Sequence, residues 1–156
     1  MIRNAVTDDY IEMDVLFRTS AQELCVEAYS RDIVDAWVGS PQPERFVLGA
    51  ESDVEQYVLL QESKIVCFGS INIEKQLLVS LFVAPSHIGT GIGSTLLKFL
   101  IKRATNAGVK TLRLDSSLNA VNFYLRHGFV EKRKGEFMTK SGVILKTVIM
   151  ERALCT

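Results

Sequence analysis

Apolar and polar positions along the chain predict β-structure in its middle. Residues 55–61 and 64–73 are rich in β-forming residues, and the polar residues 62–63 between them predict a tight hairpin. Residues 77–83 follow as a nearly continuous apolar run that ends before Pro85, which is typical of a buried central strand. The middle of the chain is therefore expected to supply the centre of a sheet.

Helical spacing of apolar residues is found on both sides of this β-region. Before it, residues 10–28 and 31–38 repeat at helical spacing, and the second helix is expected to begin after Ser30 and to end at Gly39. After it, apolar residues within 96–104 recur in the same way. Helices are thus expected to cover the sheet.

The two ends of the chain complete the order of elements. A first strand is expected within residues 1–6, and Thr7 is the expected cap of the first helix. Near the other end we expect a strand over residues 110–114 and a helix within residues 116–126. Residues 129–151 alternate well enough to predict a terminal hairpin.

The predicted order is β-α-α-β-β-β-α-β-α-β-β, with residues 45–48 ambiguous. It predicts an α/β (α+β) fold whose sheet is mixed and mostly antiparallel, with one central parallel β-α-β crossover. A ligand is expected at the carboxyl end of strand 77–83, where the crossover begins. Residues 1–156 suffice for a single domain with a sizeable core.

Composition argues against several classes of partner. The formal net charge is zero, which gives no electrostatic reason to bind nucleic acid, and no apolar run reaches the roughly 18 residues of a membrane helix. Cys25, Cys67 and Cys155 are widely spaced, and with only two histidines they suggest neither a disulfide framework nor a metal site. We expect a cytoplasmic protein, and the sequence leaves a homodimer open.

The most informative segment is the glycine-rich turn after strand 77–83. Gly89, Gly91 and Gly93 would let the backbone approach a ligand without Cβ atoms in the way. The first turn of the following helix has amide N–H groups without internal partners, and the helix dipole adds partial positive charge there. Together they predict an anion site, above all for phosphate. A loop whose glycines serve only turn geometry is the alternative.

Three phosphate-binding chemistries compete for this loop. A P-loop requires a lysine after its last glycine, and residues 89–95 contain none. A dinucleotide fingerprint would have Asp115 at a tolerable distance, but Gly93 comes one residue too early and the remaining sheet is made of hairpins. The third candidate ligand is coenzyme A.

The residues around the loop resemble a known family. The segment VAPSHIGTGIG, residues 83–93, follows an apolar strand and resembles motif A of the GNAT N-acetyltransferases, usually written Q/R-x-x-G-x-G/A. Gly91 and Gly93 match the last two motif positions, whereas Ile88 occupies the Gln/Arg position. In the family, backbone amides of this loop hold the pyrophosphate. An isoleucine at position 88 therefore loses one side-chain contact but does not abolish the binding site.

A second block carries the same resemblance. The segment AVNFYLRHGF, residues 120–129, resembles the family's motif B, because F-Y-x-x-x-G-F recurs at the expected distance after motif A. Ser117 stands where many relatives place an asparagine seven residues before the tyrosine, Tyr124. The resemblance is firm in the second half of the chain, and it is to the bacterial single-domain type.

The resemblance implies an enzyme that moves an acetyl group from acetyl-CoA directly to a primary amine of a small-molecule or peptide acceptor. It implies that the pantetheine arm pairs with the central strand, which also offers an N–H to the thioester oxygen. Tyr124 would serve the leaving thiolate as general acid or as electrostatic stabiliser. The residues expected to contact CoA are Leu81, Phe82, Val83, Gly89, Thr90, Gly91, Ile92, Gly93, Ser94 and Ser117.

The sequence does not name the general base. Asp115, Glu74 and His87 are candidates, but each is at least as readily a solvated, turn or incidental residue. Cys67 could suggest a covalent enzyme intermediate, although an apolar strand usually buries its cysteine as a small hydrophobic residue. A non-catalytic acyl-CoA-binding sensor or scaffold is the alternative function.

The acceptor pocket is the least defined part. By resemblance, the N-terminal helices cover this side of the cleft, where Tyr29, Trp37 and Phe46 would form an aromatic wall if they faced inward. Packing in the core is the alternative for each of them. The chain has no acidic cluster of the type that attracts polycationic amines.

Overall fold

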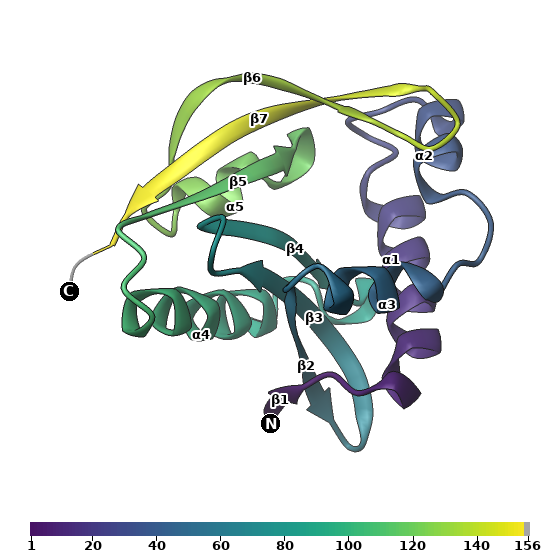
Figure 1. Cartoon of the computed structure of the whole chain (residues 1–156). Helices are drawn as coiled ribbons and strands as arrows, with labels where there is room; N and C mark the ends of the chain where they lie inside the picture. The colour runs from purple at the N-terminus through teal and green to yellow at the C-terminus, as the bar shows by residue number, and fades with distance from the viewer. Residues whose placement is uncertain (155–156) are drawn as a thin grey trace.

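The computed structural model describes residues 1–154, which form a mixed sheet with helices on both faces (Figure 1). Short 3-10 turns precede α1, α4 and α5. The helices and strands, in chain order, are β1 (Ile2–Asn4), α1 (Tyr10–Leu24), α2 (Arg31–Val38), α3 (Glu44–Glu51), β2 (Glu55–Gln61), β3 (Lys64–Asn72), β4 (Leu77–Val83), α4 (Ile92–Asn106), β5 (Thr111–Ser117), α5 (Val121–Leu125), β6 (Val130–Met138) and β7 (Ile144–Ala153).

The described residues form a seven-stranded sheet in the order β1-β2-β3-β4-β5-β7-β6. Neighbouring strands are antiparallel apart from β4 and β5, which are parallel because α4 carries the chain back to the starting edge between them. This confirms the predicted fold class, with a mostly antiparallel sheet and one central β-α-β crossover.

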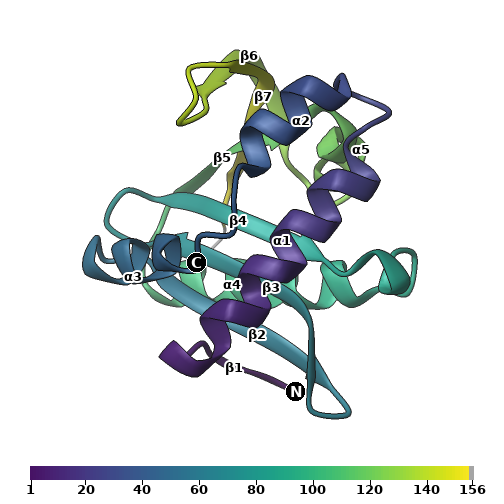
Figure 2. The ribbon, with the colours of Figure 1, turned by 90° about the vertical axis from the view of Figure 1, so that its right-hand side faces the viewer.

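A hydrophobic core lies on each face of the sheet. Figure 2 shows α1 in front of the sheet and α4 behind it. On the α4 face, Leu96, Leu97 and Leu100 are completely buried, as their helical spacing predicts. On the other face, α1 buries Met13 and Phe17 against the sheet and α2. The two cores fix the helices that surround the middle of the sheet.

Helix α3 is an element that the sequence pattern did not predict. It begins after Pro43 and covers the ambiguous residues 45–48. Phe46 is its one buried side chain, whereas Val47 and Leu48 are exposed. Because its apolar residues do not share one face, the segment lacks the periodic signal by which a helix is recognised.

The first helix also begins differently from the prediction. The expected cap Thr7 lies inside a 3-10 turn, and the carboxylate of Asp9 takes over the capping role by accepting the N–H of Val6 at 2.8 Å. The same carboxylate accepts two hydrogen bonds from the guanidinium of Arg3, at 2.7 and 3.0 Å. Asp9 therefore ties β1 to the start of α1.

Replacing Asp9 with alanine should lower the free energy of unfolding by about 1 to 2 kcal/mol at neutral pH, because the N–H of Val6 loses its acceptor. The hydrogen bond from Arg3 holds the pKa of Asp9 below its ordinary 3.8. The stabilisation is thus present above about pH 4 and is lost as the pH falls through the lowered pKa. Denaturant unfolding of both proteins from pH 7 to pH 3 should show their difference shrinking, and a constant difference would contradict this role.

Candidate functional site

Strands β4 and β5 pair at their beginnings and then diverge. Leu77 lies opposite Arg113 and Leu78 opposite Leu114, and the described residues contain no further pair between these strands. On its other edge, β5 pairs with β7 over all seven of its residues. The sheet is therefore open in its middle, and facing backbone edges of β4 and β5 have no partner strand.

A β-bulge in β4 lies where the divergence begins. Ser80 is opposite Ser70 and Leu78 is opposite Ile71, so Val79 has no partner in β3. Such an extra residue bends a strand and increases its twist. The bulge thus turns the second half of β4 away from β5.

Tyr29 holds the other side of the opening in place. Its hydroxyl donates to the carbonyl of Lys146 in β7 and accepts the N–H of Leu118 just after β5, at 2.9 Å. Tyr29 is 7% exposed, and burial raises its pKa, so the phenol keeps the proton that it donates. Tyr29 is not among the residues that line the cavity, so it belongs to the core and anchors the end of β5.

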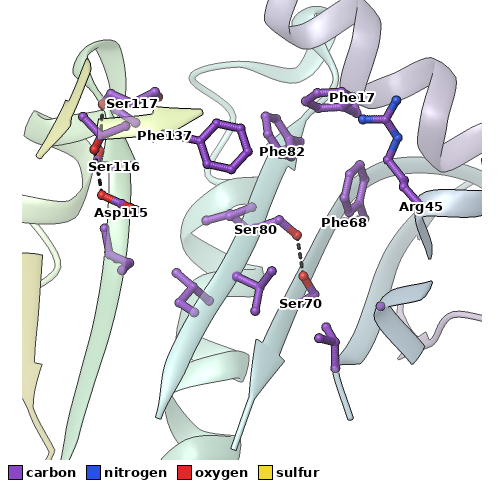
Figure 3. A pocket seen from close by; sticks show the side chains of 18 of the residues that line it. Phe17, Arg45, Phe68, Ser70, Ser80, Phe82, Asp115, Ser116, Ser117 and Phe137 are labelled. Carbon is purple, nitrogen blue, oxygen red and sulfur yellow. Dashed lines mark hydrogen bonds between the residues drawn. The ribbon is translucent and has the colours of Figure 1, made fainter. Parts of the chain in front are cut away.

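A cavity of about 380 Å³ lies along the opening between β4 and β5 and under α1 and α3 (Figure 3). Its size is that of a small-molecule site. The residues singled out from the sequence that line it are Leu81, Phe82, Ser117 and Tyr124, together with Trp37, Phe46 and Asp115.

The backbone of β4 presents hydrogen-bonding groups to this opening. Ala84 donates its N–H to the carbonyl of Val66 at 2.8 Å, so it faces β3, and Phe82 faces the same way because backbone groups alternate along a strand. Leu81 and Val83 consequently direct their N–H and C=O groups toward the opening. The predicted backbone contact thus falls on these two residues, while Phe82 contributes its side chain to the cavity wall.

The glycine-rich loop lies at the carboxyl end of β4. Gly89 and Gly91 have φ angles of 79° and 85°, in the left-handed region that favours glycine, and a Cβ at either position would meet open space. Within residues 1–154, the N–H groups of Gly89, Gly91 and residues 92–94 have no acceptor in the protein. This cluster of free donors at a helix N-terminus is suited to an anion such as a phosphate group.

Gly93 serves close packing rather than an unusual backbone angle. A Cβ at this position would lie 3.1 Å from Cγ2 of Val83 and 3.5 Å from the ring of Phe123. The loop can therefore pack tightly between the end of β4 and helix α5. The two sequence blocks around Gly91 and Tyr124 are therefore in contact through Gly93 and Phe123.

Positive charge gathers beside the loop. Ser94 in the first turn of α4 is hydrogen-bonded to Nε2 of His127 at 2.9 Å. Burial lowers the pKa of His127, and the nearby cations Lys98, Arg126 and Arg152 lower it further. Sequence reasoning missed this cluster, because its members come from α4, from the end of α5 and from β7.

Tyr124 is buried between the loop and the cavity. It is 7% exposed, and Phe123 and Phe129 pack edge-on against its ring, with centroids 5.2 and 5.6 Å away. Burial, and next the neighbouring thiol of Cys67, raise the pKa of Tyr124 well above that of a free phenol. The hydroxyl thus keeps its proton at neutral pH and has no hydrogen-bond partner among residues 1–154. It can donate that proton to a group in the cavity.

The three candidates for the general base lie in different surroundings. Asp115 lines the cavity, and its Oδ1 accepts a hydrogen bond from the hydroxyl of Thr147 at 2.7 Å. Glu74 is an exposed turn residue, and His87 is hydrogen-bonded to Ser86; neither lines the cavity. The structure thus brings Asp115 alone of the three to the opening.

A family model described as an acetyltransferase (GNAT) domain matches residues 25–151, which include the open strand, the loop and Tyr124. The chain belongs to the GNAT acetyltransferase family. This confirms the resemblance of its two motifs, and it makes the protein a member of a family of acyltransferases that bind acetyl-CoA.

Individual GNAT proteins agree with this assignment. A GCN5-related N-acetyltransferase from Rhodopseudomonas palustris is 25% identical, with a TM-score of 0.91 over 99% of this chain and 95% of the other. The uncharacterized N-acetyltransferase YafP of Escherichia coli is 28% identical over 82% of this chain and 79% of its own length. The PaiA N-acetyltransferase of Thermoplasma acidophilum, solved with coenzyme A, shares the fold at 22% identity, with a TM-score of 0.78 over 98% of each chain.

Two residues of this GNAT protein depart from the family motifs. Ile88, at the Gln/Arg position, is 51% exposed, and its apolar side chain cannot donate a hydrogen bond to a phosphate. Ser117 lines the cavity, and its hydroxyl does not cap the 3-10 turn that follows. At the position of Ile88 only backbone groups can therefore contact an anion, and the Ser117 hydroxyl has no hydrogen-bond partner among residues 1–154. No helix within residues 1–154 combines the length and hydrophobicity needed to cross a membrane.

Cys67 of this GNAT protein should be chemically inert in the native state. It is completely buried, and burial raises the pKa of its thiol to about 12. Cys25 is also buried, with a pKa of about 11, whereas Cys155 lies outside the described residues. Because the thiolate is the reactive species, iodoacetamide at pH 8 should leave Cys67 and Cys25 unlabelled until denaturant is added. Peptide-resolved mass spectrometry would contradict this if Cys67 were labelled rapidly in the folded protein.

Proposed function

We propose that this GNAT protein transfers the acetyl group of acetyl-CoA directly to a primary amine of a small-molecule or peptide acceptor. The observation that carries the proposal is that three features adjoin the open part of β4 and its carboxyl end. These are the unpaired edge of β4, the free amides of the glycine loop, and the buried, protonated hydroxyl of Tyr124. In this order, they would align the pantetheine arm, anchor the pyrophosphate and supply a proton to the leaving sulfur.

Binding of acetyl-CoA would use the backbone more than side chains. The free N–H groups of Gly89, Gly91 and residues 92–94 are suited to the pyrophosphate, and the positive charge around His127 favours the same anion. The N–H and C=O groups of Leu81 and Val83 would pair with the amides of the pantetheine arm, as an added strand does. An N–H on this edge can also stabilise the negative charge that develops on the thioester oxygen.

The transfer itself forms a bond between the amine nitrogen and the acetyl carbon and breaks the bond between that carbon and sulfur. Tyr124 would donate its proton to the leaving sulfur, because burial keeps the phenol protonated. The attacking neutral amine loses one proton to solvent, and solvent returns one proton to the phenol. The inert thiol of Cys67 supports direct transfer without an acetylated cysteine. The buried thiols of Cys25 and Cys67 are also compatible with a reducing compartment such as the cytoplasm.

Replacing Tyr124 with phenylalanine should lower kcat by about a hundredfold, since general acid catalysis typically contributes this much or more. The rise in melting temperature that acetyl-CoA produces should persist, because the ring remains in place. Initial rates of free-thiol release measure the first effect, and a thermal melt measures the second.

The matched control is Tyr57→Phe, because Tyr57 is equally buried but donates its hydroxyl to Glu55, away from the cavity. Tyr57→Phe should keep wild-type turnover. Full activity in Tyr124→Phe would exclude the general-acid role. A protein that binds acetyl-CoA but acetylates no amine in a broad screen would instead be the non-catalytic acyl-CoA-binding module.

Replacing Gly91 with aspartate should abolish the rise in melting temperature with acetyl-CoA, because a carboxylate and a Cβ would face the pyrophosphate. Gly108→Asp is the control, since Gly108 has a φ of 86° and open space around it, at the opposite end of α4. Both variants carry similar backbone strain, so only the response to acetyl-CoA should differ. An equal response in the two variants would refute the loop as the phosphate site.

A further inference from the structure

The wall of the cavity under α1 and α3 is aromatic. The rings of Phe17 and Phe82 have centroids 4.9 Å apart, those of Phe68 and Phe82 lie 5.5 Å apart, and those of Phe46 and Phe68 lie 5.4 Å apart. Trp37 joins this series at 5.5 Å from Phe17. A molecule that enters from this side meets a continuous apolar surface.

The polar groups within this wall already satisfy one another. The hydroxyls of Ser70 and Ser80 are hydrogen-bonded to each other at 2.5 Å. The side-chain amide of Gln56 donates to the carbonyl of Phe46 at 3.0 Å. The middle of the cavity therefore offers few side-chain hydrogen bonds to a ligand and favours an apolar body.

Arg45 of α3 is the cation at one end of this wall. Its Nε–H donates to the carbonyl of Gln42 at 3.0 Å and lies 3.0 Å from Oδ1 of Asp14, and its guanidinium stacks 4.7 Å above the ring of Phe17. The two Nη groups have no hydrogen-bond partner among residues 1–154, and the side chain is 26% exposed. A rigid fork of N–H donors is thus open at this end.

The opposite end of the cavity is negative. Arg45 and Asp115 are the two charged residues that line the cavity within residues 1–154, and Figure 3 shows them at opposite ends. Asp115 follows Leu114, the last residue of β5 that pairs with β4, so it lies where the opening begins. One carboxylate oxygen accepts from Thr147, and the other is available.

We propose that the acceptor is a small amino carboxylic acid with an apolar body, an inference that rests on the proposed acetyl transfer. Its amine would lie at the opening near Asp115, its apolar body against the aromatic wall, and its carboxylate on the two Nη groups of Arg45. The guanidinium fork matches a carboxylate in a bidentate manner, which a neutral group cannot reproduce. The same cation disfavours acceptors that carry a second ammonium group.

The first test uses the wild-type protein saturated with acetyl-CoA and pairs of amines that differ in the carboxylate. Phenylalanine is compared with phenethylamine and leucine with 3-methylbutylamine, and 6-aminohexanoate with hexylamine covers a longer spacing. Initial rates of thiol release, expressed per neutral amine, should favour at least one carboxylate over its partner by about ten- to a hundredfold in kcat/KM. Equal or higher rates with all three carboxylate-free amines would overturn the proposal and leave the acetyltransferase assignment intact.

Variants then assign the selectivity to Arg45. Arg45→Met should reduce the ratio of carboxylate to carboxylate-free rates toward one, whereas Arg31→Met, an exposed arginine on α2, should keep it. Because Arg45→Met leaves the buried Asp14 without its cation, folding is checked by the melting temperature with and without acetyl-CoA. Unchanged selectivity in a folded Arg45→Met protein would refute the assignment.

Asp14→Asn supplies a test in the opposite direction. The asparagine oxygen can still accept the N–H of Gln42, which now bonds Oδ2 of Asp14 at 3.1 Å. Loss of the competing negative charge should raise the preference for carboxylates severalfold. A lower or unchanged preference would count against the proposal.

Direct binding separates the two proposals. Calorimetry of phenylalanine, leucine and 6-aminohexanoate against their carboxylate-free partners, with the protein held saturated with CoA, needs no turnover. If no amine in the broad screen is acetylated, the acetyltransferase proposal fails, while tighter binding of a carboxylate would still support the role of Arg45. Equal binding of both members of every pair would overturn the proposed role of Arg45.

Discussion

The structure depends on a pair of adjacent parallel strands that stop pairing in the middle of a sheet. Unpaired backbone groups in the interior are unfavourable unless something satisfies them, so strands that begin together normally continue together. Here three features hold the strands apart: β5 follows β7, with which its other edge pairs along the whole strand, Val79 forms a bulge in β4, and Tyr29 fixes the chain just beyond β5. The open edge of β4 thus keeps hydrogen-bonding groups available for a ligand that pairs with it as an added strand does.

The other parts of the site are arranged around this edge. The glycine loop begins where β4 ends, so that the free amides of α4 lie at the carboxyl end of the open strand. The absence of a side chain at Gly93 lets the loop pack against α5. That contact places the glycine loop against Phe123, the neighbour of Tyr124, whose burial keeps its hydroxyl protonated. The position of Tyr124 and the protonated state of its hydroxyl thus both follow from the packing of α5.

The face opposite α4 has a different character. There α1, α2 and α3 place aromatic rings over the cavity, with one cation and one carboxylate at its two ends. Arg45 and Asp115 are not needed to fill the hydrophobic core on this face, which is made of buried apolar side chains such as those of Met13, Val34 and Val38. Selectivity for the acceptor can therefore vary while the acetyl-CoA side remains the same.

The sequence alone determined the features that depend on a few neighbouring residues. Strand β4, helix α4, the cap at Ser30 and the glycine loop were predicted with nearly correct bounds, since periodicity, capping and glycine act over a few residues. The GNAT family followed from the same loop and from the block around Tyr124. Only the tertiary structure decided the divergence of β4 and β5, the clamp at Tyr29, the basic group around His127 and the position of Arg45 on the unpredicted helix α3. These features join residues far apart in the chain through strand register and side-chain packing, which no local pattern of apolar and polar residues records.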